Sequence, residues 1–344
     1  MITPMITQID AYHSLSLPTL NDVQQAATRL SPYVRHTPTL RSQTLSDKLG
    51  ANVYLKMELF QKTGAFKLRG AFNKALTLSA KEKARGVVAV SGGNHAQAVA
   101  YAAKTLGLQA VILMPDATPH NYLDATAGYG AKVILTATMS AAFKRIPAYE
   151  AEGWVYIHPY DDPLVIAGQG TVGLEILEDV PQVTDVILSI GGGGLAGGVG
   201  TAIKTNQPKV RIWGVETDGA DSMARALSAN RIIELPQITS IAKTLGAPAV
   251  TERTLTLAKK YLEGVTVVQD REAVEALKFL LERMKVLTEP AASCTVAAAE
   301  RLKHHFDSDS HVVLILCGGN FAVDALVQYD FALRSSALDR VQAA

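Results

Sequence analysis

Cysteine is scarce in this chain of 344 residues, which contains only Cys294 and Cys317. Two cysteines cannot form a disulfide framework, and such a content fits a reducing compartment. No apolar run reaches the roughly 18 residues that a membrane helix needs. The opening residues, MITPMITQID, contain neither the basic region nor the apolar region of a secretory signal. We therefore expect a soluble, cytoplasmic protein that does not bind membranes.

An excess of either charge is also missing. The chain has 33 Lys and Arg against 32 Asp and Glu, a net charge of +1, so the basic footprint of a nucleic-acid-binding protein is absent. Hydrophobic residues make up 48% and charged residues 19%, which is an ordinary globular balance. The length suits two domains. Because no long linker separates two halves, we expect one domain inserted in another, with a ligand-binding cleft between them.

Short apolar runs alternate with helical patterns along the chain. Helices are expected after an N-cap at Thr19, with Asp22 three residues on, and after an N-cap at Asp270. The apolar runs predict buried strands over Val87–Val90, Ala110–Met114, Lys132–Leu135, Val155–His158, Val186–Ile190, Arg211–Val215 and His311–Cys317. This alternation predicts an α/β fold whose sheets are mostly parallel and covered on both faces.

One segment places a lysine at the start of a helix. The strand-like run VYLKMEL leads into a glycine-containing turn, and a helix is expected from about Phe66. Lys67 then lies in the first turn, where the positive end of the helix, together with Lys62 and Arg69, would lower its pKa. A lowered pKa favours the free amine that a Schiff base needs. A solvated basic turn is the alternative interpretation.

Glycine-rich turns follow three of the predicted strands. The segment SGGNHAQ, residues 91–97, offers backbone N–H groups to a carboxylate, or is an ordinary turn with Asn94 as the N-cap. Four glycines, residues 191–194, suit a phosphate but fit no nucleotide-binding fingerprint. Cys317 precedes two glycines and either meets a ring edge or is simply a buried thiol. Ligands bind at such carboxyl ends of strands, and these parts together suit pyridoxal phosphate.

The motifs TGAFKLRGA, SGGNHAQ, DDPLVIAGQGTVGLEI, GGGG and EPA…CGGN, in this order, resemble the serine/threonine dehydratases. These are fold-type II pyridoxal-phosphate enzymes and include the serine racemases. The resemblance, from about Val34 to Asn320, implies two open, mostly parallel sheets flanked by helices, with the cofactor in an interdomain cleft. It implies a large domain, 1–79 and 160–344, split around a small one, 80–159. Only ~24 residues follow Asn320, so no appended regulatory domain is expected. A homodimer is the expected assembly.

The resemblance also implies roles for individual residues. Lys67 would carry the cofactor beside Phe66, and Asn94 would hydrogen-bond the ring hydroxyl. The cofactor phosphate would be held by Gly191, Gly192, Gly193, Gly194 and Leu195. Cys317 stands where the family places a Ser or Cys against the pyridine nitrogen. The substrate carboxylate would be bound by Ser91, Gly92, Gly93 and His95.

Several positions depart from the family pattern. Tyr122 stands where many members have Lys, and the other departures are Ala65, Lys243 with Thr244, and Ala292 with Ser293. Racemases carry a Ser at the position of Gly92 as a base on the second face of the cofactor, so racemisation should be minor here. Glu216 and Ala220 resemble two ligands of a Mg²⁺, Ca²⁺ or monovalent cation site, but Ser222 replaces the usual Asp. A solvated Glu216 is the alternative.

The expected reaction is the β-elimination of L-threonine and/or L-serine to a 2-oxo acid and ammonia. Lys67, once displaced by the substrate amine, would take the Cα proton. Cys317 is a weak donor and cannot keep the pyridine protonated, which favours elimination over transamination. The alternatives are a dehydratase of another 3-hydroxy amino acid such as 3-hydroxyaspartate, a serine racemase, a β-replacement lyase, and a relative that binds the cofactor but is catalytically silent.

Overall fold

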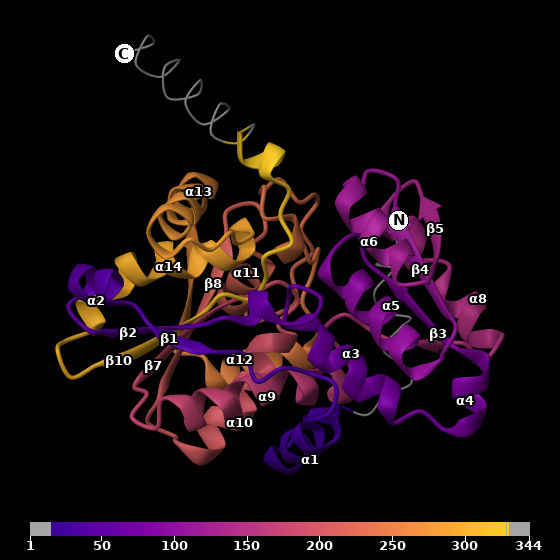
Figure 1. The fold of residues 1–344 in the computed structure, drawn as a ribbon, viewed down its shortest axis with the longest axis horizontal. Coiled ribbons are helices and arrows are strands. Elements are labelled where there is room, and N and C mark those ends of the chain that lie inside the picture. Colours follow the sequence, from indigo (N-terminus) through magenta and orange to yellow (C-terminus); the bar gives the residue numbers. More distant parts are fainter. Residues whose placement is uncertain (1–14, 328, 330–344) are drawn as a thin grey trace, which may run out of the picture.

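Two sheets lie side by side in the computed structural model, which describes residues 15–327 and 329 (Figure 1). The opening residues considered for a secretory signal, and residues 330–344 of the tail, lie outside this range. The larger sheet has the order β1-β2-β10-β7-β8-β9, and the smaller has the order β5-β4-β3-β6. Their strands are β1 (Thr39–Arg41), β2 (Asn52–Lys56), β3 (Val87–Val90), β4 (Ala110–Pro115), β5 (Lys132–Thr136), β6 (Val155–Tyr156), β7 (Asp185–Ser189), β8 (Arg211–Thr217), β9 (Gly264–Val268) and β10 (His311–Ile315).

Helices connect these strands and cover the sheets. The α-helices are α1 (Leu20–Leu30), α2 (Gln43–Leu49), α3 (Lys67–Leu76), α4 (Ala80–Arg85), α5 (Asn94–Leu106), α6 (His120–Gly128), α7 (Met139–Phe143), α8 (Ile146–Ala151), α9 (Pro163–Asp179), α10 (Gly194–Asn206), α11 (Ser222–Ala229), α12 (Glu252–Tyr261), α13 (Asp270–Phe279) and α14 (Pro290–Leu302). Short 3₁₀ turns lie at Glu58–Phe60, Lys243–Leu245 and Lys303–His305, and a π-turn lies at Leu280–Met284. Within the described ranges, no helix has both the length and the apolar character needed to cross a membrane.

The predicted α/β class with mostly parallel sheets is confirmed. The strand pairs are parallel, except for the antiparallel pair of β1 and β2. The run predicted over Val155–His158 forms a strand only over Val155–Tyr156. β1 and β9 were not predicted, because β1 has only three residues, none of them buried, and β9 is mostly half-buried. Neither strand has the continuous apolar run of a central strand.

The two predicted helix starts have different outcomes. Thr19 caps α1, because its Oγ1 accepts the N–H of Asp22 (3.3 Å) and its own N–H donates to the Asp22 carboxylate (2.8 Å). The expected N-cap at Asp270 is wrong by one residue, since Gln269 precedes the first turn of α13. The Asp270 carboxylate instead accepts from Ser240 Oγ (2.6 Å) and the Ile241 N–H (3.0 Å), so it holds a neighbouring loop.

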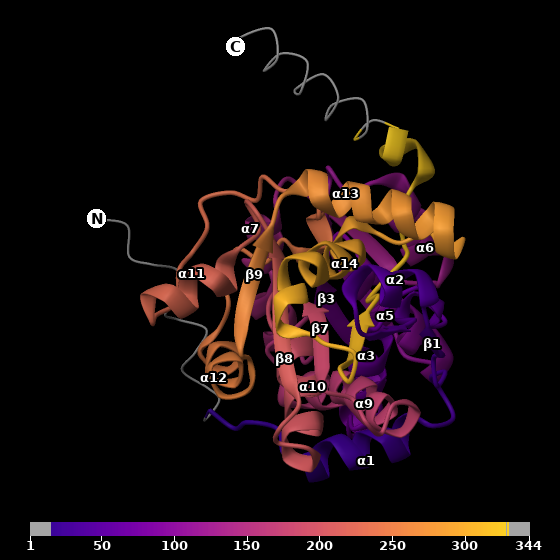
Figure 2. The same ribbon diagram turned by 90° about the vertical axis from the view of Figure 1, so that its left-hand side faces the viewer.

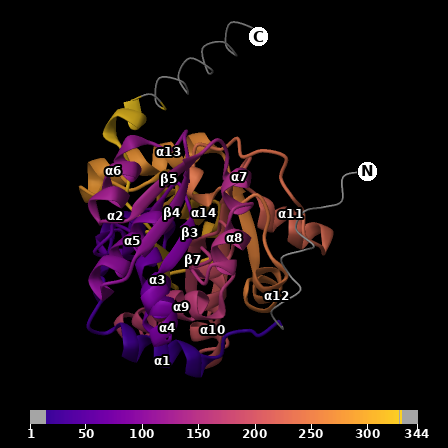
Figure 3. The same ribbon diagram turned by 90° about the vertical axis from the view of Figure 1, so that its right-hand side faces the viewer.

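Helices lie on both faces of each sheet. Figures 1 and 2 show α13 and α14 on one side of the larger sheet and α9 and α10 on the other. In the smaller sheet, Val87 and Ala89 of β3 pack with residues of α5, while Val88 and Val90 pack with residues of α7 and α8 (Figure 3). α3 contacts both α5 and α9. Its first residue, Lys67, therefore lies where the helical layers of the two sheets meet.

A buried ion network fixes α3. The guanidinium of Arg69 is fully buried and donates to Glu58 (2.7 and 2.8 Å) and Glu175 (2.6 and 2.8 Å). Replacing Glu58 with Gln removes one charge partner from a desolvated cation, so we expect the free energy of unfolding to fall by about 3–5 kcal/mol. Urea denaturation measures this loss. The control is Arg271→Ala, which breaks an exposed ion pair with Glu275 and should cost less than about 1 kcal/mol. Equal losses in the two variants would contradict the prediction.

Candidate active site

The amine of Lys67 points into the protein. Its Nζ donates to the carbonyl of Pro159 (2.7 Å) and lies 5.1 Å from the centroid of the Phe66 ring. Burial lowers the pKa of Lys67 to about 8. The contribution expected from Lys62 and Arg69 is wrong, because burial is the largest cause and Arg69 is neutralised by Glu58 and Glu175. The solvated-turn alternative is also wrong, since Lys67 is partly buried and held by a hydrogen bond.

Two of the four glycines, Gly192 and Gly194, pack against Tyr160, the residue that follows Pro159. A Cβ atom on Gly192 would lie 2.1–2.4 Å from ring atoms of Tyr160, and one on Gly194 would lie 3.0 Å from the Tyr160 Cα. Gly193 has a φ of 94°, a conformation that side chains disfavour. α10 begins at Gly194 without a side-chain cap, so its first N–H groups are available to an anion. The loop therefore fits a phosphate group close to Lys67.

The remaining members of this loop are also enclosed by protein. A Cβ atom on Gly191 would lie 3.2 Å from the Leu245 carbonyl oxygen, and Leu195 is buried. The second glycine-rich turn reaches the same segment, because a Cβ atom on Gly93 would lie 3.2 Å from the Thr244 methyl carbon. The short turn Lys243–Leu245 therefore contacts both loops that were predicted to bind anions.

The turn at residues 91–95 exposes backbone donors rather than charge. Ser91 Oγ accepts the N–H of Gly93 (3.1 Å), and α5 starts after Gly93 without a side-chain cap. His95 Nε2 contacts the Ile157 carbonyl (2.8 Å), and burial lowers the pKa of His95 to about 3. A neutral His95 cannot attract a carboxylate by charge. The N–H groups around Gly92 are therefore the donors that this turn offers to an anion.

Cys317 is both a buried thiol and a neighbour of Lys67. Its Sγ accepts from Ser189 Oγ (3.3 Å), and its carbonyl accepts the N–H of Phe66 (3.1 Å). Burial raises the pKa of the Cys317 thiol to about 12, so sulfur stays protonated. A neutral thiol in this position fits the edge of an uncharged pyridine ring.

Glu289 is the first residue of the EPA motif, but no role was expected for it from the sequence. The structure brings it to Asn94, which does not cap α5 as the alternative interpretation required. Asn94 Nδ2 donates to Glu289 Oε1 (2.8 Å), and Asn94 Oδ1 accepts from Asn320 Nδ2 (2.8 Å). Burial raises the pKa of Glu289 to about 7. An acidic residue directly before the proline that opens a buried helix of small residues is the signal that could have found it.

Glu216 and Ala220, the residues expected at a cation site, form hydrogen bonds within the protein. Glu216 is fully buried, so the solvated alternative is wrong, and its carboxylate accepts the N–H groups of Met223 (2.9 Å) and Ala224 (2.8 Å). The N–H of Ala220 donates to the Thr217 carbonyl (2.8 Å). Among the residues that the structure describes, no cluster of three or more His, Cys, Asp or Glu could hold a metal. A hard cation takes about six or more oxygen ligands, waters included. We assign no step of the reaction to a cation.

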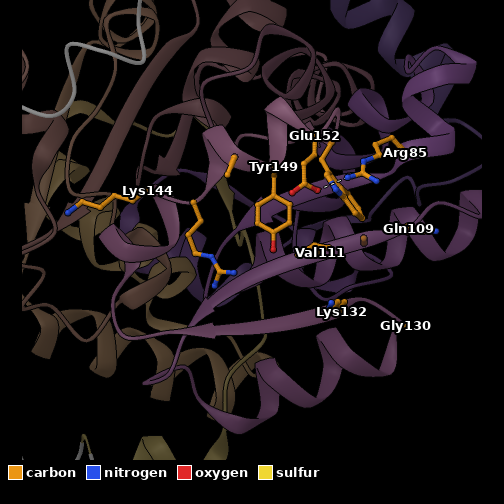
Figure 4. A pocket seen from close by; sticks show the side chains of 12 residues that line it. Arg85, Gln109, Val111, Gly130, Lys132, Lys144, Tyr149 and Glu152 are labelled. Carbon is orange, nitrogen blue, oxygen red and sulfur yellow. Dashed lines mark hydrogen bonds and ion pairs between the residues drawn. The ribbon is translucent and has the colours of Figure 1, made fainter.

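A surface hollow of about 800 Å³ lies elsewhere, at the amino ends of β4 and β5 (Figure 4). Its basic lining includes Lys132, Lys144 and Arg85, and Arg85 pairs with Glu152 (2.6 Å). None of the residues predicted to bind cofactor or substrate lines it. Ligands of open α/β sheets bind at the carboxyl ends of strands, so the candidate active site is the region around Lys67.

Comparisons with known proteins identify the family of this chain. The model of the family described as pyridoxal-phosphate dependent enzyme matches residues 30–318. An L-threonine ammonia-lyase of Thermotoga maritima is 41% identical over 90% of this chain and 77% of that protein. The structure of maize serine racemase superposes with a TM-score of 0.87 at 35% identity, over 94% of this chain and 99% of the racemase. The processed form of threonine deaminase isoform 2 from Solanum lycopersicum gives a TM-score of 0.84 at 32% identity, over 90% of this chain and 89% of the deaminase.

Proposed function

The chain belongs to the family of pyridoxal-phosphate-dependent enzymes, and from this premise we propose that it is an ammonia-lyase that converts L-threonine and/or L-serine into a 2-oxo acid and ammonia. The observation that carries the proposal is the position of Lys67. Its buried amine lies beside Cys317 and donates a hydrogen bond to the Pro159 carbonyl. The next residue, Tyr160, packs on the glycine loop. The similarity to curated L-threonine ammonia-lyases supports the choice of substrate.

The cofactor contacts follow from the groups around Lys67. Bound pyridoxal phosphate supplies an aldehyde that condenses with amines and a ring that withdraws electrons from Cα. The N–H groups of residues 191–195, at the start of α10, would hold its phosphate. Phe66 would pack beside the ring, and the amide of Asn94 would donate to the ring hydroxyl. The Cys317 thiol would face the ring nitrogen without charging it.

The residues of the site also explain why elimination is favoured over transamination. In the turn formed by Ser91, Gly92 and Gly93, the N–H groups of Ser91 and Gly93 already donate to the Leu113 carbonyl and to Ser91 Oγ. The N–H of Gly92 and the uncapped N–H groups at the start of α5 would therefore bind the substrate carboxylate and orient the Cα–H bond toward Lys67. With its pKa lowered, the Lys67 amine can accept that proton near neutral pH. An uncharged ring retains electrons poorly, so departure of the β-hydroxyl is favoured over transamination.

An assay for 2-oxo acid with L-threonine, L-serine, D-serine and both isomers of 3-hydroxyaspartate tests the proposal. We expect 2-oxo acid and ammonia in equal amounts from L-threonine, L-serine or both. Activity on 3-hydroxyaspartate alone would favour the alternative dehydratase. Absence of any turnover, with a visible cofactor band that borohydride abolishes, would indicate a silent relative. The homodimer and the cytoplasmic location stay predictions, the first of which analytical ultracentrifugation checks.

Gly92 should keep racemisation below elimination. With L-serine we expect pyruvate to form faster than D-serine, because residue 92 offers no acid or base on the face opposite Lys67. A Cβ atom on Gly92 would lie 2.8 Å from Thr118 Oγ1, so Gly92→Ser alone is crowded. The double variant Gly92→Ser, Thr118→Ala removes the crowding and should raise the D-serine share more than Gly92→Ser does.

Chiral analysis of L-serine incubations measures this share. Thr118→Ala alone is the matched control and should leave the ratio of D-serine to pyruvate unchanged. Faster formation of D-serine than of pyruvate by the wild-type chain would mean that another residue supplies the second proton.

A further inference from the structure

Four residues form a closed ring of hydrogen bonds next to Lys67. Asn94 of α5 donates to Glu289, which precedes α14, and accepts from the side chain of Asn320, which follows β10. The hydroxyl of Tyr122 in α6 contacts both Glu289 Oε2 (3.5 Å) and the backbone carbonyl of Asn320. The ring therefore joins two helices beside the smaller sheet to two segments beside the larger sheet.

The hydrogen-bond geometry of this ring indicates whether Glu289 carries a proton. Tyr122 has one hydroxyl proton, and the closer of its two contacts is the Asn320 carbonyl, which can only accept. Glu289 Oε1 already accepts from Asn94 (2.8 Å). The Tyr122 hydroxyl lies 3.5 Å from Glu289 Oε2, so a phenol proton directed at Asn320 leaves this contact weak, whereas a proton on the carboxyl would strengthen it. Thr244 is a further hydrogen-bond partner of this carboxyl, and its hydroxyl can accept as well as donate. The geometry thus favours Glu289 as a neutral carboxylic acid.

The charges around Glu289 agree with this assignment. The titratable groups that face it are Lys67 of α3, Tyr122 of α6, Cys294 of α14 and Cys317 after β10. Within the described part of the chain, Glu289 forms no ion pair. Burial outweighs the hydrogen bonds to the carboxyl and the attraction of Lys67, and raises the pKa of Glu289 to about 7.

We propose that Tyr122 and Glu289 are positioning residues that hold the Asn94 amide toward the cofactor, with Glu289 acting as a carboxylic acid. The inference rests on the proposed function through the contact between Asn94 and the cofactor. The Asn94 Nδ2 atom donates to Glu289, and the Asn94 Oδ1 atom accepts from Asn320. These two hydrogen bonds fix the plane of the amide, and with it the direction of the second N–H of Nδ2. A neutral Glu289 also avoids a negative charge that would raise the pKa of Lys67. An ammonium at position 122, where many dehydratases have Lys, would ionise Glu289.

Infrared difference spectroscopy on the full chain loaded with pyridoxal phosphate tests the proton directly. We expect a protonated-carboxyl C=O band that is present at pH 6 and lost with a midpoint of about 7. Glu289→Gln should remove the band. Tyr122→Lys should also remove it at pH 6, whereas the matched variant Tyr122→Phe adds no charge and should retain it. Tyr122→Phe should weaken cofactor binding about fivefold, as expected for one lost hydrogen bond.

Several outcomes would overturn the inference. A spectrum at pH 6 that Glu289→Gln leaves unchanged would show that Glu289 carries no proton. A band that persists in Tyr122→Lys would show that a charge at position 122 does not act on the Glu289 carboxyl, and so that the side chain at 122 does not contact it. If Glu289→Gln does not fold, the pair Tyr122→Lys and Tyr122→Phe still decides the question. The band does not depend on which amino acid is turned over, so a failed 2-oxo acid assay would refute the proposed function without altering this result.

Discussion

Replacing Lys67 with alanine should abolish 2-oxo acid formation, with kcat falling by roughly 10²- to 10⁴-fold or more, as for removal of a proton-transferring nucleophile. The loss follows from the surroundings of the amine. The Lys67 amine donates a hydrogen bond to the Pro159 carbonyl. It lies beside Cys317, Glu289 and the Phe66 ring. The visible band of the bound cofactor should disappear together with turnover, because both depend on the same nitrogen.

Two other lysines make this experiment specific. Lys56 is fully buried, but its ammonium is held by Glu175 (2.8 Å) and Asp179 (3.1 Å) and cannot replace Lys67. Lys62 directly precedes the TGAFKLRGA motif and is exposed, so Lys62→Ala is the matched control and should keep both the band and the activity. A Lys67→Ala protein that folds and retains the band would assign the cofactor to a different lysine.

Local sequence patterns predict the fold and the parts of the site that backbone supplies. Strands such as Val87–Val90 are continuous apolar runs, and the glycine turns follow them directly along the chain. β7 and β10 are parallel neighbours in the larger sheet, so the turns that follow them must lie near one another. The turn after β3 belongs to the smaller sheet, and the packing of the two sheets brings it to the others. Gly193 illustrates the agreement, because its positive φ is a property that four consecutive glycines already indicate.

Side-chain partners that are distant along the chain could not be predicted in this way. Asn94 and Glu289 are separated by 195 positions, and Tyr122 and Asn320 by 198. Only the packing of α5 and α6 against the segments before α14 and after β10 brings them together. For the same reason the cause of the lowered Lys67 pKa was misassigned, since burial depends on the whole fold while neighbouring cations are visible in the sequence.

The second large effect that we expect is a loss of cofactor binding in Gly193→Val, in the loop of four glycines. A β-branched residue at a φ of 94° costs about 1–3 kcal/mol. The new Cβ would also lie 2.8 Å from the Thr254 Cβ and 2.9 Å from the Met223 Cε. Protein atoms therefore already fill the space into which the new side chain would extend. The loop must move, and the N–H groups at the start of α10 move with it.

We expect Gly193→Val to weaken pyridoxal phosphate binding by about 10- to 100-fold, which corresponds to about 1.4–2.8 kcal/mol. Absorbance titration of the cofactor measures this, and thermal unfolding without cofactor measures the cost to the fold. Gly192→Val should act similarly, since its Cβ would strike the Tyr160 ring. Gly128→Val is the matched control, because a Cβ atom at Gly128 meets nothing within 4 Å. If a folded Gly193→Val protein binds the cofactor as tightly as Gly128→Val does, the four glycines form only a turn, and the phosphate must be held by other residues.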